Sequence, residues 1–131
     1  MTMLQAGFVI PRGTTNSVVD RIVQAEERGI GQVWSTAGGI SCDTLTSFAI
    51  AASRTERVVL GTSIVPTYPR HPFVLVSEAL AIADVAPERR RLGIGGSHRP
   101  TIEGSFGIPM GKPLAHLREY LGILRSLLWE G

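Results

Sequence analysis

Small hydroxyl-bearing residues follow the apolar run VVLG. Thr62 and Ser63 come directly after Gly61, and a proline-rich segment and a helical pattern lie beyond them. In parallel βα units, a strand that ends in this way places its last side chains at the carboxyl edge of a sheet, where α/β proteins carry their chemistry. Small side chains there would let a flat ring system approach the backbone. The structural alternative is that they only relieve crowding at a strand end.

A glycine-rich loop forms a second candidate segment, made of Gly95, Gly96, Ser97, His98 and Arg99. Its backbone N–H groups could hold the oxygen atoms of a cofactor, and the guanidinium of Arg99 could pair with an anionic group. The letters GIGG are also part of a dinucleotide-binding fingerprint. However, Pro100 and a long loop follow where that fingerprint requires a helix, so the sequence argues against a dinucleotide site.

The three histidines are the other candidates for chemistry. His71 precedes Pro72 at a predicted helix start, which also fits a capping role, and His98 lies in the glycine-rich loop. His71, His98 and His116 are far apart and have no cysteine or carboxylate at ligand spacing, so we expect no metal site. No serine lies in a nucleophile elbow, and no Walker loop is present. The sequence therefore names no catalytic acid, base or nucleophile.

The composition is that of an ordinary α/β domain, with 44% hydrophobic residues, 18% charged residues and 15 glycines. The formal net charge is only +2 and the basic residues are spread along the chain, so we expect no nucleic-acid partner. The longest apolar stretch, residues 73–85, contains Ser77, Glu78 and Asp84, and we expect neither a membrane span nor a secretory signal. A single cysteine, Cys42, fits a reducing compartment and predicts a cytoplasmic protein.

Strand and helix patterns alternate four times along the chain. Strands are predicted over residues 5–10, 32–35, 57–65 and 91–94. Helices are predicted over residues 16–28, 44–53, 71–86 and 114–128. Ser41 or Asp43 should cap the second helix, and Leu117, Leu121, Leu124 and Leu128 should form the packing stripe of the last. Right-handed crossovers in this order give a parallel four-stranded sheet with helices on its outer face.

The segments VVLGTSIVPTYPRHP (58–72) and RLGIGGSHRP (91–100) resemble the luciferase-like flavin and deazaflavin oxidoreductases, a TIM-barrel superfamily, and most closely its deazaflavin branch. The resemblance covers nearly the whole chain, taken as one domain over residues 1–131. A whole (β/α)8 barrel takes about 250 residues. The resemblance therefore implies an α/β fold that is the N-terminal half of such a barrel, with four parallel strands alternating with helices. It also implies hydride transfer between a deazaflavin, coenzyme F-420, and a small organic substrate.

The same resemblance implies where the cofactor lies. In deazaflavin-dependent relatives a non-prolyl cis peptide lies behind the cofactor ring, and here it maps to Ser63–Ile64, while the glycine-rich loop approaches the cofactor. The implied cofactor contacts are Thr62, Ser63, Ile64, Gly95, Gly96, Ser97, His98 and Arg99. Many relatives carry an acidic residue or a histidine after the second strand. This chain has Ser35 and Thr36 there, whose hydroxyls could hydrogen-bond the ring or a substrate carbonyl.

Two alternatives stay open. One is an FMN-dependent monooxygenase of the same fold, because the phosphate site that separates the branches belongs to later strands of the barrel. The other is an inactive half-barrel that acts only as an assembly or interaction module.

A truncated barrel also has consequences for assembly. A half-barrel leaves strand edges unpaired, and we expect it to expose inner-face side chains of Phe8, Ile10, Val33, Leu60, Ile64 and Ile94. We therefore expect a homo-oligomer or a second chain that completes the barrel, and weak cofactor binding by the isolated chain.

Overall fold

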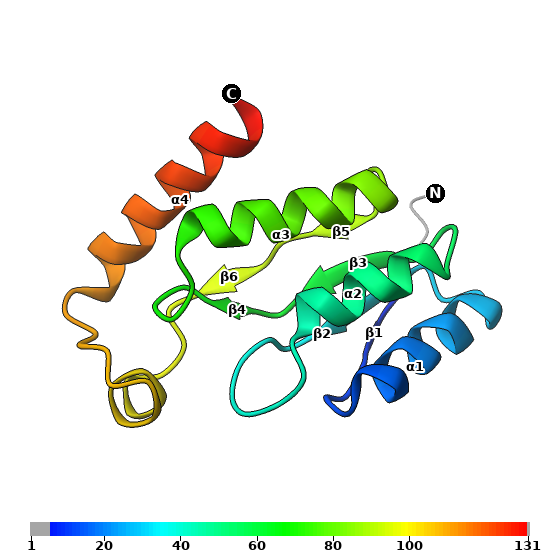
Figure 1. The fold of residues 1–131 in the computed structure, drawn as a ribbon, viewed down its shortest axis with the longest axis horizontal. Helices are drawn as coiled ribbons and strands as arrows, with labels where there is room; N and C mark the ends of the chain where they lie inside the picture. Colours follow the sequence, from blue (N-terminus) through cyan, green and yellow to red (C-terminus); the bar gives the residue numbers. More distant parts are fainter. Residues whose placement is uncertain (1–5, 131) are drawn as a thin grey trace.

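The computed structural model describes residues 6–130 and consists of successive strand–helix units (Figure 1). The main elements are β1 (Gly7–Val9), α1 (Thr15–Glu27), β2 (Gln32–Ser35), α2 (Thr44–Ser53), β3 (Val59–Thr62), α3 (Pro72–Val85), β5 (Arg90–Arg91) and α4 (Pro113–Trp129). Two short strands, β4 (Val65–Pro66) and β6 (Ile94–Gly95), follow β3 and β5, and a π-helix, η1 (Pro100–Ser105), precedes α4. The helices α1, α2 and α3 lie side by side on one face of the strands, with α4 beyond α3.

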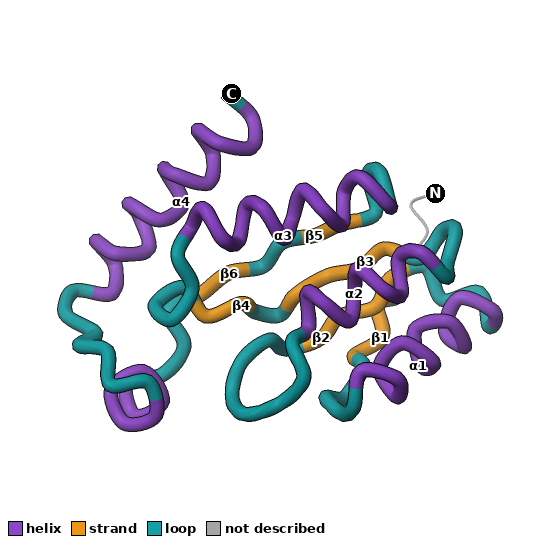
Figure 2. The backbone as a smooth tube through the Cα atoms, viewed as in Figure 1, coloured by secondary structure: helices purple, strands orange, loops and turns teal. Residues whose placement is uncertain are grey.

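The strands form a layer beside the helices (Figure 2). They pair in parallel throughout the described part of the chain. Four of them form one sheet in the order β1-β2-β3-β5, and β4 pairs with β6. In this register Val33 of β2 lies between Phe8 of β1 and Leu60 of β3. Each strand therefore neighbours the next unit along the sequence, as in the wall of a barrel. The predicted alternation of parallel strands with helices is confirmed.

The hydrophobic core lies between the sheet and its helices. Val33 and Leu60 are at most 1% exposed and belong to one buried cluster with Ile22 of α1, Phe48 of α2 and Leu75 of α3. Because side chains alternate along a strand, the neighbours of Val33 and Leu60 in the sequence must face away from these helices.

Trp34 occupies that opposite face of the sheet. A Cβ atom on Gly61 would lie 2.4 Å from Trp34 Cε3, and one on Gly7 would lie 2.8 Å from Trp34 Nε1. The indole thus lies across the two neighbouring strands and needs glycine on both. Val9, which is paired with Trp34 in the register, is 68% exposed.

The expectation of an exposed inner face was therefore wrong for four of its six side chains, namely Phe8, Ile10, Val33 and Leu60. Ile10, Val33 and Leu60 are buried on the helix side, and Phe8 shares the face of Val33, where it is 54% exposed at the edge strand. An alternating apolar pattern distinguishes two faces of a strand but does not show which of them the helices cover.

Polar side chains cap the helices at their starts. Thr14 Oγ1 accepts a hydrogen bond from Ser17 N at the start of α1. Asp43 Oδ2 accepts from Thr46 N at 2.8 Å, so Asp43 rather than Ser41 caps α2. His71 Nδ1 accepts from Phe73 N at 3.3 Å, which confirms the capping role considered for His71.

The third predicted strand is interrupted after Thr62. The Ser63–Ile64 peptide bond is cis, as the resemblance implied, and the chain then continues as β4. The fourth predicted strand is divided in the same place into β5 and β6. The Thr62 hydroxyl joins the two breaks, because it donates to Gly93 O at 2.8 Å and accepts from Gly93 N at 2.9 Å.

Helix α4 packs through a face that includes Leu124 and Leu128 of the predicted leucine stripe but not Leu121. Its buried residues are Tyr120 and Leu124, whereas Leu121 is 44% exposed. The Tyr120 hydroxyl donates to Arg70 O at 2.7 Å. This polar contact, which a search for apolar residues overlooks, turns Tyr120 towards the start of α3.

Candidate cofactor-binding site

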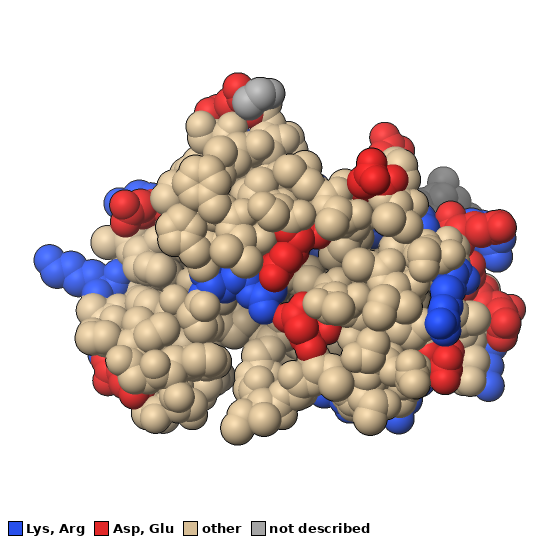
Figure 3. Space-filling view, viewed as in Figure 1, with Lys and Arg blue, Asp and Glu red and all other residues tan. Residues whose placement is uncertain are grey.

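A cavity of about 580 Å³ opens at the carboxyl edge of the sheet. Its walls come from the loops after β1 and β2, the cis peptide between β3 and β4, and the segment that leads from β6 into η1. Figure 3 shows a hollow in the surface between the lobe that holds η1 and the loop after β2. The cavity therefore lies at the edge where parallel βα units place their functional residues.

Five of the residues expected at the site line this cavity: Thr36, Ser63, Ile64, Ser97 and His98. They belong to three different strand–helix units, and only the fold brings them together. Their hydroxyl groups and the imidazole can donate hydrogen bonds to a ligand. Ser97 has a φ of 58°, in the left-handed region, where the chain turns out of β6.

Two of the expected hydroxyls lie beneath the cavity instead. Ser35 is 2% exposed, and its Oγ donates to Ile10 O at 3.1 Å, which ties β2 to the end of β1. Thr62 is also 2% exposed and makes its two hydrogen bonds to Gly93. Both hydroxyls hold neighbouring strands together below the wall that would face a ligand.

The rest of the glycine-rich loop lies beside the cavity. The carbonyl of Gly95 accepts from Thr67 N at 3.0 Å as part of the β4–β6 pairing. A Cβ atom on Gly96 would lie 3.5 Å from Met110 Cε. The Arg99 guanidinium contacts Glu103 Oε1 at 2.6 Å across one turn, so a carboxylate of this chain already neutralises it.

Arg12 is a cavity residue that the sequence reasoning missed. It lies in the loop after β1, and its Nη1 donates to Gly38 O at 2.5 Å. The rule that parallel strands end at one edge of the sheet also holds for the first strand, and it points to the loop that contains Arg12. Phe106 also lines the cavity, but its position depends on η1, which no sequence pattern predicts.

A family model described as luciferase-like monooxygenase matches residues 3–131. The chain belongs to the luciferase-like monooxygenase family. A Mycobacterium tuberculosis protein named as a coenzyme F-420-dependent oxidoreductase is 36% identical to it over 106 residues, which are 81% of this chain and 30% of that protein. A coenzyme F-420-dependent glucose-6-phosphate dehydrogenase of Beutenbergia cavernae is 36% identical over 104 residues, covering 76% of this chain and 30% of its own length. The luciferase-like chain thus spans about 30% of these relatives.

Two solved structures share the fold of this luciferase-like chain. The coenzyme F-420-dependent tetrahydromethanopterin reductase from Methanopyrus kandleri matches with a TM-score of 0.83 and 19% identity, over 95% of this chain and 40% of that one. The FMN complex of the oxygenating constituent of 3,6-diketocamphane monooxygenase from Pseudomonas putida matches with a TM-score of 0.82 and 19% identity, over 96% and 40%. At this identity the likeness concerns the fold. It confirms the predicted half-barrel architecture.

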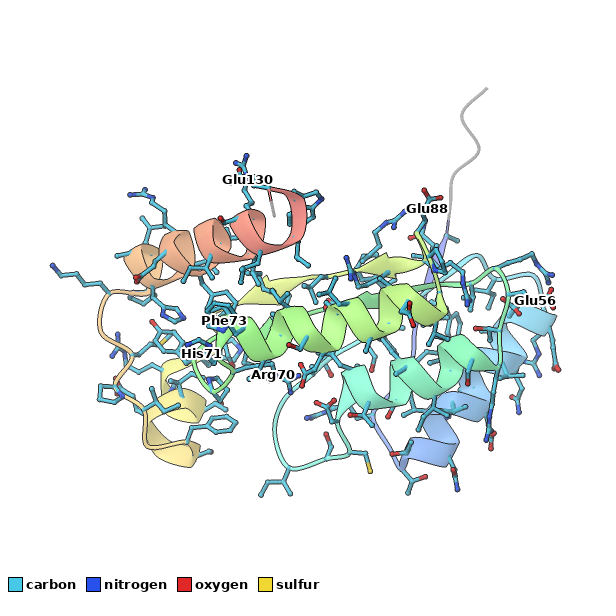
Figure 4. The ribbon with its side chains drawn as sticks, turned by 45° about the horizontal axis from the view of Figure 1, so that its top comes forward. Glu56, Arg70, His71, Phe73, Glu88 and Glu130 are labelled. Atoms are coloured by element: carbon cyan, nitrogen blue, oxygen red, sulfur yellow. The ribbon has the colours of Figure 1, made fainter. Side chains whose placement is uncertain are left out.

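A charged network supports the luciferase-like site from the helix side. Arg70 contacts Asp43 Oδ1 at 2.8 Å and Glu78 Oε2 at 2.6 Å, and it lies with His71 and Phe73 at the start of α3 (Figure 4). Burial raises the pKa of Asp43, but hydrogen bonds from Arg70 and the α2 backbone outweigh burial and lower it overall. Arg70 therefore links the starts of α2 and α3, and two carboxylates compensate its charge.

His116 belongs to an aromatic cluster outside the cavity. Its ring stacks on Tyr68 with 3.9 Å between centroids, and its Nε2 lies 2.9 Å from Thr67 Oγ1. The Tyr68 hydroxyl donates to Met110 O at 2.5 Å. These contacts attach α4 and the segment before it to the end of β4.

The described lining of the cavity contains no carboxylate. Within residues 6–130, no three His, Cys, Asp or Glu side chains are grouped so that they could hold a metal ion. None of the helices in the same range is long and apolar enough to cross a membrane.

Proposed function

We propose that this chain forms the cofactor-facing part of an oxidoreductase that transfers a hydride between the deazaflavin coenzyme F-420 and a small organic substrate. The observation that carries the proposal is the cavity at the carboxyl edge, into which Ser63, Ile64, Ser97 and His98 converge from neighbouring units. Relatives named as dependent on coenzyme F-420 support this choice of cofactor.

The cavity fits a flat ring in size and in the chemistry of its lining. Its volume of about 580 Å³ lies within the usual range for small-molecule sites. Gly38 and Gly39 leave one wall without side chains, and a Cβ atom on Gly38 would lie only 3.0 Å from Pro66 Cγ. Hydroxyls, apolar atoms, the His98 imidazole and the Arg12 guanidinium line the space, and no carboxylate does so among the described residues. This lining suits an aromatic ring that carries polar atoms at its edge.

The bound coenzyme would supply the hydride chemistry, and the chain would orient the ring and exclude water. Ser63 and Ser97 would donate hydrogen bonds to ring oxygen or nitrogen atoms, and Ile64 and Phe106 would give apolar contact. Thr36 would face the ring or the substrate. His98 is the imidazole on the cavity wall and could hold a proton there. We assign no catalytic acid or base.

Titration with oxidised coenzyme F-420, followed by its fluorescence, tests the proposal. His98→Ala should weaken binding, because it removes a cavity donor. His71→Ala is the matched control, since His71 caps α3 and does not line the cavity; it should lower helix stability but leave coenzyme affinity unchanged. Saturable binding that responds equally to both substitutions, or no binding at any concentration, would contradict the proposal.

A flavin enzyme is the second candidate, and the FMN complex of the Pseudomonas putida structure favours it. Repeating the titration with FMN in place of coenzyme F-420 distinguishes the two candidates, because the ligand that binds more tightly identifies the branch. A chain that binds neither would be an inactive assembly or interaction module.

We further propose that a second copy of this chain covers the exposed part of the sheet. Strand β1 pairs only with β2 among the described residues, and its Phe8 and Val9 are 54% and 68% exposed. Two copies of four units would supply the eight of a closed barrel, with β5 of one beside β1 of the other. A site completed in this way would bind cofactor more tightly than an isolated chain.

Cys42 is an exposed free thiol, which supports placing the protein in the cytoplasm.

A further inference from the structure

The cavity carries positive charge that no acidic side chain of its own lining balances. Arg12 and His98 are the ionisable residues on its wall. Nearby arginines are neutralised within the chain: Arg70 contacts two carboxylates and Arg99 contacts Glu103. Among the ion pairs of residues 6–130, none includes Arg12. A guanidinium beside a ligand cavity, with no carboxylate partner, is suited to an anion from outside the chain.

The loop after β2 holds this guanidinium in place. Arg12 Nη1 donates to Gly38 O at 2.5 Å, which uses one of the five N–H donors of the group. A Cβ atom on Gly39 would lie 2.8 Å from the same nitrogen, and Gly39 has a φ of 71°. The positive φ of Gly39 favours glycine at the turn, and the missing Cβ leaves room for the arginine to approach it. The bond to Gly38 orients the guanidinium, and among residues 6–130 its other donors have no hydrogen-bond partner and can serve a ligand.

We propose that Arg12 binds an oxyanion, a carboxylate or phosphate group, of the ligand that occupies this cavity. The inference rests on the proposed function for the identity of the cavity as a ligand site, and it adds that the ligand is anionic. The oxyanion belongs either to the cofactor or to the substrate. His98 lines the same cavity and would donate a second hydrogen bond.

Inorganic phosphate is the simplest probe of Arg12. Titrating the ¹⁵N-labelled chain with phosphate should shift the amide signals of Gly38 and Gly39 in a saturable way. Arg12→Met should weaken phosphate binding by about tenfold or more, the effect of losing a charge-assisted hydrogen bond. Arg54→Met is the control, because it removes the same charge at the C-terminal end of α2, by the opposite edge of the sheet, and should leave the affinity unchanged.

A pair of flavins identifies the source of the oxyanion and tests for a purely structural role. If the phosphate belongs to the cofactor, Arg12→Met should weaken FMN but not riboflavin, which lacks the phosphate. If the oxyanion belongs to the substrate, Arg12→Met should weaken the binding of inorganic phosphate but of neither flavin. Equal weakening of FMN and riboflavin would mean that Arg12 merely shapes the loop, and it would overturn the inference. So would unchanged phosphate affinity in Arg12→Met, or equal loss in Arg54→Met. The titration with inorganic phosphate needs no cofactor. Its result can therefore be interpreted even if the proposed function is wrong.

Discussion

Replacing Thr62 by valine tests the two hydrogen bonds that link the end of β3 to Gly93, beside the wall of the cavity. Thr62 is 2% exposed, and its hydroxyl both donates to and accepts from the backbone of Gly93. Valine has nearly the same shape, so the substitution removes the two hydrogen bonds without opening a cavity in the core. Ser63 and Ile64, which line the ligand cavity, are the next two residues after Thr62.

The expected loss of stability follows from these contacts. Two hydrogen bonds at about 1 kcal/mol each, together with the cost of leaving the Gly93 N–H without its acceptor, predict a loss of about 2–3 kcal/mol in the free energy of unfolding. Thr62→Ser keeps the hydroxyl and loses one methyl group, for which about 1 kcal/mol is expected. Valine should therefore be clearly the more damaging substitution, although it is the more hydrophobic one.

Urea unfolding followed by far-ultraviolet circular dichroism measures both changes. The midpoint should fall further for Thr62→Val than for Thr62→Ser, with similar slopes if the two native states are equally compact. A valine variant as stable as the parent, or more stable than the serine variant, would refute the reasoning. It would show that the hydroxyl does not secure the breaks in the two strands.

Three further predictions concern other contacts. Glu26→Gln should lower stability by about 1–3 kcal/mol in thermal melts, because the Glu26 carboxylate accepts three backbone N–H groups, two of them, from Arg57 and Val58, at 2.7 Å. Burial raises the Glu26 pKa but these bonds lower it overall, so this stabilisation should decline as the pH falls below the usual 4.5, and the glutamine variant should lack that dependence. Burial raises the Tyr120 pKa from 10.0 to about 12, so the unfolded chain loses its proton first. Stability should therefore fall as the pH rises across that interval, and less so in Tyr120→Phe. Light scattering at low micromolar concentration should give a dimer mass, and a monomer mass would contradict the second-copy proposal.

Local signals in the sequence predicted the order and type of the main elements. Asp43 and Pro72 mark helix starts through bonding rules that involve only a few neighbouring residues, and the structure has both helices there. The cis peptide at Ser63–Ile64 came from a family resemblance and not from any property of the two residues. The convergence of Ser63, Ser97 and Thr36 followed from the rule that parallel strands end at one edge.

Features that depend on distant contacts could not be predicted in this way. The face of Val33 that the helices cover depends on how the sheet and helices pack, which an alternating pattern leaves open. Tyr120 is buried because it reaches Arg70, 50 residues away in the chain. The position of Phe106 depends on η1, which lies within a segment rich in glycine and proline that reads as a loop.

The indole of Trp34 gives the exposed face of the sheet an optical label. The chain has two tryptophans, and the other, Trp129, is 71% exposed at the end of α4. Trp129→Phe would leave a single emitter that lies over Gly7 and Gly61, away from the helix-side core and outside the lining of the ligand cavity. Its emission wavelength would report how much water touches that face. Trp34 emission would then follow coverage of the sheet, while the fluorescence of coenzyme F-420 follows occupancy of the cavity.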